Sequence, residues 1–468
     1  MAGYLAVDIG ASSGRHMYAE TKDGKLRLTE VYRFENFMDE TKDGLLYWDA
    51  ERLFREVKAG MRACAEKGFK PDYMGIDTWG DDFMLLDKSG KPLTPCVAYR
   101  DSRTAGMDKK LDEIIPESEY FERTGSARHI FNTVYHLMAI KQSQPEALES
   151  AETLLLLPSY LMYLLTGKGV NEYSEATTTG LIDAKARDWD RDMIEKIGLP
   201  ARLFKEKPTM PGTPLGRVKD EIAAETGLSC EVVIAPTHDT GAAFLAAPMA
   251  DDETIVLNSG TWSLLGVESA EPILGKASLE SGFSNEGAYG GRIRYLKNIM
   301  GMWIIQCIRR EDGKRFSYAE MAEMVVPYLS FPSRIDAVSE RFLAPKSMTE
   351  EIKNAVIESG QTEVTCFGEL LAVCYNSLAD AYKNSVTELE KLTGKRFTKI
   401  NIMGGGSQNE TLNRLTAEVT GLPVYAGPAE CTALGNIASQ MLACGEAGSV
   451  AHAREIIRDS FSLKEYKA

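Results

Sequence analysis

A short polar turn near the start of the chain constrains the fold more than any other feature. Residues 4–9 form an apolar stretch typical of a buried strand, and the small polar turn at residues 10–15 follows it. Residues 16–34 continue as short alternating segments around an Asp23-Gly24 turn signal, which predicts a second strand here and not a helix. A P-loop or a dinucleotide-binding unit requires a helix at this point, so both are excluded.

The same strand–turn–strand pattern recurs in the second half of the chain. Apolar residues 254–258 run into a turn at 259–261, and another apolar strand follows at residues 262–267. An internal duplication explains both copies, and the alternative is a chance pair of glycine-turn hairpins. Because no proline-rich or low-complexity linker divides the chain, we place the boundary at the repeated opening and predict domains at residues 1–245 and 246–468.

Helix signals flank several of the predicted strands. Asp49 is a good N-cap for a helix whose apolar positions recur at helical spacing until Gly68. Near the C-terminus, a long helical pattern ends at Gly394 and precedes a strand at residues 399–403 and a glycine turn at 404–407. A further helix follows this turn, and a glycine turn between a strand and a helix N-terminus suits the phosphates of a nucleotide.

Composition limits the kind of ligand and the cellular compartment that we expect for the protein. The 468 residues are 44% hydrophobic and 26% charged, as in an ordinary globular protein, and the formal net charge is -15. This charge opposes binding to nucleic acid or to anionic membranes and favours a small neutral substrate. The eight cysteines include no Cys-x-x-Cys pair, and neither a signal peptide nor a membrane-spanning stretch is visible. We expect a cytoplasmic protein with reduced thiols, present as a monomer or small homo-oligomer.

The two polar turns are candidate phosphate sites. Small residues in the first turn let backbone N–H groups approach phosphate oxygens, while Ser12, Ser13 and Arg15 supply further donors. Asp8, just before this turn, is placed to hold Mg²⁺ through water, and a bound ATP would need such a cation. The alternative is a plain surface hairpin that follows a strand-end aspartate. The matching turn that ends at Thr261 favours the phosphate site.

A candidate general base follows the apolar residues 232–235. There, His238, Asp239 and Thr240 open an alanine-rich helix. A carboxylate at such a strand end can accept the proton of a sugar hydroxyl and orient the attacking oxygen toward a γ-phosphate. The alternative is that Asp239 or Thr240 caps the helix, a role that does not exclude proton transfer.

Residues 75–83 place an aromatic ring, a glycine and acidic groups at another strand end. Carbohydrate sites use such groups because sugars offer hydroxyl edges to acceptors and apolar faces to rings, as Trp79 would provide. The paired carboxylates of Asp81 and Asp82 equally suggest glycoside hydrolysis or a metal site. Alternatively, both are solvated turn residues.

Taken in order along the chain, these motifs resemble those of the FGGY carbohydrate kinases, which have the actin-like ATPase fold. The resemblance runs nearly end to end. It rests on residues 7–15, 76–80, 98–103, 131–133, 176–179, 238–240, 259–263 and 296–301. It implies an α/β fold of two actin-like (RNase H-like) domains with a cleft between them. The first would bind the sugar and part of ATP, and the second the nucleotide.

The resemblance also implies a reaction and a set of residues. The reaction is transfer of the γ-phosphate of ATP, with Mg²⁺, to the 1-hydroxyl of L-rhamnulose in rhamnose breakdown. Asp239 would accept the proton, and Asp8 would be an indirect magnesium ligand. The residues implied to contact ATP are Ala11, Ser12, Ser13, Gly14, Arg15, Thr261, Gln306 and Gly405. Those implied to contact the sugar are Gly80, His238, Asp239, Thr240 and Asn298.

One departure from the family pattern leaves the sugar open. Asp81 follows Thr78-Trp79-Gly80, where an aliphatic residue is expected, and its carboxylate either alters sugar preference or faces solvent. A kinase for another ketose or polyol, such as L-fuculose or xylulose, is therefore the nearest alternative. An actin-fold switch ATPase without sugar chemistry is a second one, and Asp239 argues against it because a switch needs no base aimed at a sugar hydroxyl.

Overall fold

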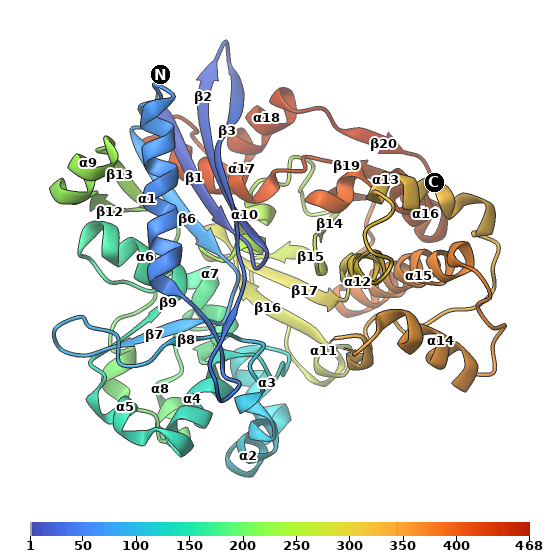
Figure 1. The fold of residues 1–468 in the computed structure, drawn as a ribbon, viewed down its shortest axis with the longest axis horizontal. Helices are drawn as coiled ribbons and strands as arrows, with labels where there is room; N and C mark the ends of the chain where they lie inside the picture. Colours follow the sequence, from blue (N-terminus) through green and yellow to red (C-terminus); the bar gives the residue numbers. More distant parts are fainter. Residues whose placement is uncertain (1, 344) are drawn as a thin grey trace. The chain divides into compact units, whose positions relative to one another are not determined.

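The structure of the protein is a computed structural model that describes residues 2–343 and 345–468. Its helices and strands, shown in Figure 1, divide into two compact units. The first unit contains the chain up to Ala246 together with Glu268–Tyr295 and Thr432–Ser460, and the second contains Ala247–Val267, Leu296–Cys431 and Phe461–Ala468. Both units are mixed α/β, as predicted. The division of labour between residues 1–245 and 246–468 stays a prediction.

A six-stranded mixed sheet forms the centre of the first unit. In spatial order its strands are β12 (Thr213–Arg217), β13 (Glu231–Ile234), β6 (Tyr73–Thr78), β1 (Gly3–Ile9), β2 (Ser13–Lys22) and β3 (Lys25–Glu35). β13, β6 and β1 are parallel, and β1, β2 and β3 form an antiparallel meander. The predicted strand–turn–strand opening is therefore confirmed. Every residue of β1 is buried, which explains its nearly continuous apolar sequence.

Helix α1 (Ala50–Glu66) packs against β2 and β3 and begins where the sequence predicts. Asp49 caps it by accepting a hydrogen bond from the backbone N–H of Arg52, and the left-handed Gly68 (φ 82°) follows its end. The helix can approach β2 closely because residue 60 is glycine. A Cβ at Gly60 would lie 2.3 Å from ring atoms of His16. The buried positions include Leu53, Val57, Met61 and Cys64, which recur at the helical spacing read from the sequence.

A second sheet, whose central strands lie in the second unit, repeats the topology of the first. Its strands include, in order, β17 (Ile293–Ile299), β15 (Ser263–Ser269), β14 (Thr254–Ser259), β18 (Lys399–Met403), β19 (Val424–Ala426) and β20 (Lys464–Tyr466). β14, β18 and β19 are parallel, while β15 and β20 pair antiparallel with β14 and β19. The β14–β15 hairpin corresponds to β1–β2, so the repeated strand–turn–strand pattern predicted from the sequence is confirmed, while its origin in an internal duplication stays a prediction.

The predicted strand, glycine turn and helix near the C-terminus are also present. α15 (Phe367–Thr393) ends at the left-handed Gly394, and β18 follows it. The chain then forms a 3-10 turn at Gly405–Gln408 and helix α16 (Glu410–Thr420), whose N-cap Asn409 accepts a hydrogen bond from the backbone N–H of Leu412. The local signals therefore placed these elements correctly.

Two hydrophobic clusters support the first unit. One lies around β1, β6, α1 and α6 (Leu157–Thr166). The other surrounds β7 (Phe83–Leu86), β9 (Thr153–Leu156) and α4 (Thr133–Ser143). The segment that follows α6 contains the short helix α7 (Tyr173–Ala176), and all four of its residues are buried. These clusters fix the strand ends that carry the candidate site.

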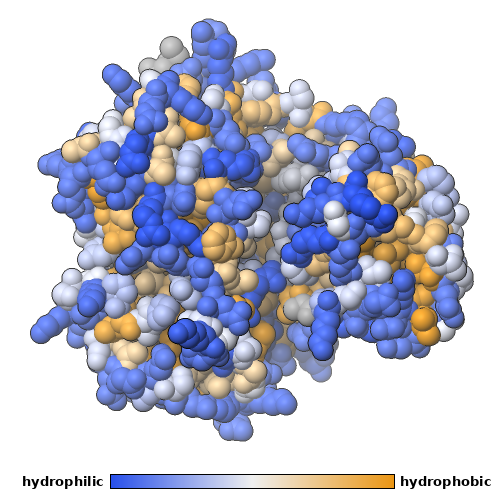
Figure 2. All heavy atoms as spheres, viewed as in Figure 1, coloured by the Kyte–Doolittle hydropathy of each residue, from blue (hydrophilic) through white to orange (hydrophobic). Residues whose placement is uncertain are grey.

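The surface and the thiols agree with the composition. Hydrophilic residues cover most of the face drawn in Figure 2, in keeping with the high charge of the chain. No disulfide joins any of the eight cysteines, all of which lie within the described residues, and seven of them are buried or half-buried. Within residues 2–343 and 345–468, no helix combines the length and the apolar character needed to cross a membrane.

Candidate active site

The carboxyl ends of three parallel strands bring aspartates to one edge of the first sheet. Asp8 of β1 pairs in register with Asp77 of β6. Beyond the end of β13, His238 forms a parallel bridge with Thr78, and Asp239 follows as the first residue of α10 (Asp239–Leu245). Ligands of open α/β sheets bind outside this edge of the strands, so this edge is the candidate active site.

The turn between β1 and β2 presents backbone N–H groups and a cation. Residues 11–12 are exposed, whereas Gly14 is buried, and a Cβ there would lie 2.1 Å from the ring of Phe34. Arg15 stands opposite Asp8 in the hairpin, with its Nη2 2.9 Å from Asp8 Oδ2. An exposed turn of small residues beside an arginine suits the oxygens of a phosphate group.

Asp8 and Asp77 together fit a hydrated divalent cation. Asp77 is fully buried and accepts a 2.6 Å hydrogen bond from Asn436 Nδ2, while its Oδ1 has no hydrogen-bond partner in the described ranges 2–343 and 345–468. Burial raises the pKa of Asp77 well above its usual value, and the charge of Asp8 adds to this rise. Two adjacent carboxyl groups, one with an unsatisfied oxygen, offer the oxygen ligands that Mg²⁺ prefers. The role of Asp8 stays a prediction.

Asp239 lies in the first turn of α10 without capping it. The N-cap residue is His238, and no side chain makes a capping hydrogen bond there. Asp239 Oδ1 instead accepts a 3.0 Å hydrogen bond from Thr240 Oγ1, and about a third of the Asp239 side chain (32%) is exposed. The alternative that Asp239 or Thr240 caps the helix is therefore wrong. A partly exposed carboxylate, oriented by a hydroxyl group, can accept a proton from a bound alcohol.

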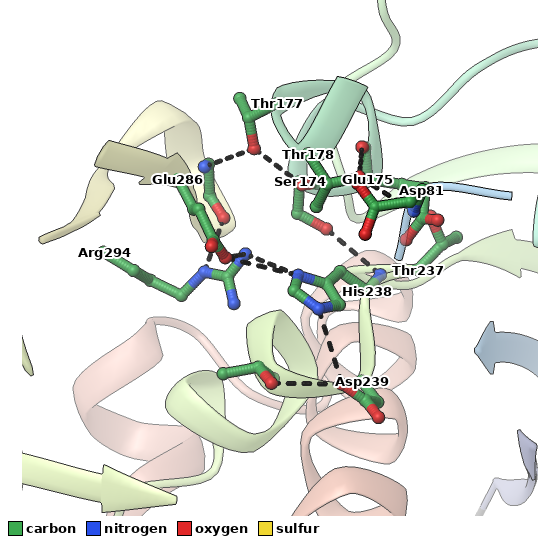
Figure 3. A network of polar contacts seen from close by, with 12 residues as sticks. Asp81, Ser174, Glu175, Thr177, Thr178, Thr237, His238, Asp239, Glu286 and Arg294 are labelled. Atoms are coloured by element: carbon green, nitrogen blue, oxygen red, sulfur yellow. Dashed lines mark hydrogen bonds and ion pairs between the residues drawn. The ribbon is translucent and has the colours of Figure 1, made fainter. Parts of the chain in front are cut away.

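His238 is part of a network of buried charges that Figure 3 shows at close range. Its Nδ1 lies 3.1 Å from Arg294 Nη2 and 3.4 Å from Oε2 of Glu286, a residue of β16 (Phe283–Gly287). Its Nε2 is 3.6 Å from Asp239 Oδ1. Burial raises the pKa of Glu286, but nearby positive charge, above all that of Arg294, outweighs this and lowers the pKa to about 2. Glu286 is therefore an anion that balances the buried Arg294.

The buried segment around α7 holds the two strand ends together. Glu172 Oε2 accepts hydrogen bonds from the backbone N–H of Thr237 (3.1 Å) and from its hydroxyl (2.9 Å). Thr178 Oγ1 accepts a 3.0 Å hydrogen bond from the backbone N–H of Asp81. A Cβ at Gly80 would lie only 3.1 Å from Thr178 Cγ2, so the chain passes closely there. Gly80 and His238 are thus positioned by one segment.

Asp81 and Asp82 are buried, so the alternative of a solvated turn is wrong. Asp82 Oδ2 accepts hydrogen bonds from the indole N–H groups of Trp48 and Trp79, both at 2.6 Å. Burial raises the pKa of Asp82 to about 7, although these two hydrogen bonds oppose the rise. Asp81 has a left-handed backbone (φ 78°), and its Oδ1 accepts a hydrogen bond of 3.2 Å from Asn132. Its extra carboxyl group lies inside the fold, next to Gly80.

Glu175 adds a further buried acid to this region. Its side chain is fully buried, and neither carboxyl oxygen has a hydrogen-bond partner within residues 2–343 and 345–468. Burial raises the pKa of Glu175 well above its ordinary value, and the charges of Asp81 and Glu172 add to the rise. Glu175 therefore holds its proton more tightly in the folded state than in the unfolded state.

Replacing Glu175 with glutamine is expected to weaken the dependence of stability on pH. Because its pKa is raised on folding, Glu175 contributes stability that is complete below its unfolded pKa and is lost as the pH rises through the folded pKa. The amide of Glu175→Gln cannot ionise. We expect the variant to gain about 1–3 kcal/mol relative to the native chain as the pH rises. Thermal unfolding at about pH 6 and about pH 9 measures this.

The exposed Glu152 supplies the matched control for this experiment. Glu152→Gln makes the same substitution at the surface, so it measures how far the exchange of a carboxyl group for an amide alone alters the slope of stability against pH. An unaltered slope in Glu175→Gln would contradict the assignment of a buried, protonated acid at position 175.

The predicted nucleotide residues of the second unit also lie near one another. The turn at Thr261 is joined to α12 (Trp303–Glu311), which carries Gln306, by a 3.0 Å hydrogen bond from the backbone N–H of Trp303 to the carbonyl of Thr261. The glycine turn packs on the residues just before Thr261, because a Cβ at Gly406 would lie 2.0 Å from Ser259 Oγ. Gly405, by contrast, has open space around it. Asn298 lies near the end of β17.

Sequence reasoning missed three charged residues of the first unit: Glu172, Glu286 and Arg294. One signal for Arg294 was available, because it interrupts the apolar strand β17 and a charge in a buried strand requires a partner. Nothing in the sequence identified that partner as Glu286 or placed His238 beside it.

Comparison with known proteins identifies the family. The model of the N-terminal domain of the FGGY family of carbohydrate kinases matches residues 3–246, and the model of its C-terminal domain matches residues 255–444. The chain belongs to the FGGY family of carbohydrate kinases. It is accordingly an ATP-dependent sugar kinase with the two-domain, actin-like fold expected from the sequence.

Curated relatives within this FGGY family match almost the whole chain. A rhamnulokinase from Halalkalibacterium halodurans is 45% identical over 463 residues, covering 99% of this chain and 98% of the relative. A rhamnulokinase from Bacillus subtilis is 36% identical over 464 residues, covering 99% of this chain and 95% of the relative. Among solved structures, a xylulose kinase from Lactobacillus acidophilus has a TM-score of 0.80 at 16% identity, covering 100% of this chain and 94% of that one. This last likeness supports the fold.

Proposed function

We propose that the protein transfers the γ-phosphate of ATP to the 1-hydroxyl of L-rhamnulose, giving L-rhamnulose 1-phosphate and ADP. The observation that supports phosphoryl transfer to a hydroxyl group is the partly exposed Asp239 carboxylate at the strand edge, which Thr240 orients. The choice of sugar rests on the full-length similarity to rhamnulokinases. A switch ATPase is disfavoured because it has no use for such a base.

Asp239 would act as the general base. Phosphoryl transfer depends mainly on positioning and on charge stabilisation, so a carboxylate contributes by accepting the hydroxyl proton and aligning the attacking oxygen. Thr240 holds Oδ1 of Asp239, which leaves Oδ2 to take up this proton. The proton would pass from the 1-hydroxyl of the sugar to Asp239 as the new O–P bond forms.

Each unit would contribute contacts to ATP. In the first unit, the exposed turn before β2 offers backbone N–H groups and Arg15 supplies a positive charge. In the second, Thr261, Gln306 and Gly405 are the proposed contacts, and they lie on neighbouring elements. Mg²⁺, held through water by Asp8, would neutralise charge on the phosphates.

The sugar would be held mainly by polar groups of the first unit. Gly80 and His238 come from adjacent strand ends, and both are positioned by the segment around α7. Thr240 and Asn298 are further proposed contacts. Buried hydrogen-bonding groups discriminate strongly between sugars, because a sugar that lacks the matching hydroxyl leaves them unpaired. Asp81, buried beside Gly80, is the group that would shift this preference toward another ketose.

A substrate panel tests the proposal. ADP formation by the purified protein with ATP and Mg²⁺ would be measured with L-rhamnulose, L-fuculose, L-xylulose, D-xylulose and glycerol. We expect L-rhamnulose to have the highest kcat/KM, by at least about tenfold, because sugars that differ in one hydroxyl misalign with a polar site. Preference for another sugar would support the assignment as a sugar kinase but contradict L-rhamnulose as its substrate. ATP hydrolysis that no sugar stimulates would reject the kinase itself.

A further inference from the structure

The contacts around His238 define the protonation of its ring. Arg294 is fully buried on β17, and its guanidinium cannot lose a proton in a protein. Its Nη2 lies within hydrogen-bond distance of His238 Nδ1, at 3.1 Å. Because arginine only donates, His238 Nδ1 must accept, and an imidazole nitrogen accepts only when it carries no proton. Figure 3 shows the guanidinium and the ring facing each other.

Glu286 is the competing partner for the same ring nitrogen. Its Oε2 lies 3.4 Å from His238 Nδ1, a longer contact that would require a proton on Nδ1. The same oxygen lies 3.0 Å from Arg294 Nη2, so the carboxylate already neutralises the guanidinium. An Nδ1–H group would also face the N–H of Arg294, leaving two buried donors opposed. The geometry therefore favours the arginine as the partner of Nδ1.

Arg294 is held in place from a second side. Its Nε donates a 2.8 Å hydrogen bond to the carbonyl of Gly287, and its Nη2, which faces His238 Nδ1 at 3.1 Å, also forms an ion pair with Glu286 Oε2 at 3.0 Å. The fork of the guanidinium is planar and rigid, so these contacts fix the direction of its donor. A lysine in this position could not make the same set of contacts.

We infer that Arg294, neutralised by Glu286, is a positioning residue that holds His238 as the neutral tautomer with its proton on Nε2. Nε2 points toward Asp239. The distance from Nε2 to Asp239 Oδ1 is 3.6 Å, which is too long for a hydrogen bond. The donor therefore remains available to an oxygen of the substrate next to the base. This last step rests on the proposed function, whereas the tautomer does not.

The tautomer can be read directly in the native protein. Long-range ¹H–¹⁵N spectra of protein labelled at its five histidines distinguish a protonated from an unprotonated ring nitrogen, and His238→Asn identifies the signals of His238. We expect the Nε2–H tautomer, because the guanidinium of Arg294 faces Nδ1 as a donor. A proton on Nδ1 would overturn the inference. This measurement needs no substrate, so it stands even if the sugar is wrongly assigned.

Arg294→Met tests which group sets the tautomer. Without the guanidinium, His238 Nδ1 is expected to become protonated and to donate to Glu286, so the Nε2–H signal should fall. The kcat/KM for the sugar should drop about 10- to 100-fold, mainly through KM for the sugar, while KM for ATP changes little. Retention of the native tautomer in this variant would reject the role of Arg294. If the variant does not fold, the tautomer observed in the native protein still tests whether His238 Nδ1 is unprotonated.

Arg454→Met is the matched control. Arg454 is also buried and paired with a glutamate, Glu268, at 2.7 Å, but it contacts carbonyl groups at the end of α10 and not His238. Its loss should lower thermal stability and leave the spectrum of His238 unchanged. A shift of the His238 tautomer in Arg454→Met would show that loss of any buried arginine disturbs the site, which would contradict a specific role for Arg294.

Discussion

Replacing Asp239 with asparagine is expected to lower kcat for sugar phosphorylation by about 100- to 10,000-fold. The amide has nearly the shape of the carboxylate and can still accept the hydrogen bond from Thr240, but it cannot take up the proton of the sugar hydroxyl. ATP binding should persist, because the proposed phosphate contacts come from other elements. Steady-state kinetics and titration with a non-hydrolysable ATP analogue measure the two effects separately.

Asp220→Asn is the control for this substitution. Asp220 is likewise the first residue of a helix, α9 (Asp220–Thr226), and it is exposed. Its replacement should leave kcat within about twofold of the native value. Full kinase activity in Asp239→Asn would remove Asp239 from its role as the base, and loss of ATP binding would point to a structural effect.

Gly435→Ala should destabilise the first unit severely. Gly435 lies in α17 (Cys431–Cys444), where a Cβ would be 1.7 Å from the carbonyl oxygen of Ala242 in α10. The obstacle is backbone, so one helix must move, and we expect the free energy of unfolding to fall by about 3 kcal/mol. The melting temperature should drop by about 5–10 °C. Since α10 carries Asp239, kinase activity should fall as well.

Gly448→Ala provides the comparison. A Cβ at Gly448 would meet nothing within 4 Å, and its backbone does not adopt a positive φ. Calorimetry should show a melting temperature within about 1 °C of the native protein. An equally small change in Gly435→Ala would mean that α10 and α17 tolerate separation, which would contradict the close packing described for these helices.

Local features of the fold were predictable because their causes are local. The end of α1 at Gly68 and its start at Asp49 follow from a capping side chain and a left-handed glycine. The two hairpins follow from apolar runs separated by short polar turns. The alternation of strand, glycine turn and helix after Gly394 was equally readable.

The candidate site was predictable in part. Asp8 and Asp239 were identified because each follows or ends an apolar strand, where parallel strands collect polar groups at one edge. Whether Asp239 caps its helix was open from the sequence, because capping depends on the side-chain conformation and not on position alone. In the structure the Asp239 carboxylate accepts a hydrogen bond from the Thr240 hydroxyl and does not cap the helix. Similarly, burial of Asp81 and Asp82 depends on indole and amide groups far away in the chain.

The sequence by itself determined the family, the paired hairpins and the strand-end aspartates, since turns, caps and apolar periodicity act over a few residues. Only the tertiary structure decided which charges meet. Arg294 reaches His238 across 56 residues of chain, and Asn132 reaches Asp81 across 51. Such contacts depend on the order of strands within a sheet and on the path of the connecting segments. A charged residue in an apolar strand indicates that a partner of opposite charge is needed. Only the packing of the strands determines which residue that partner is.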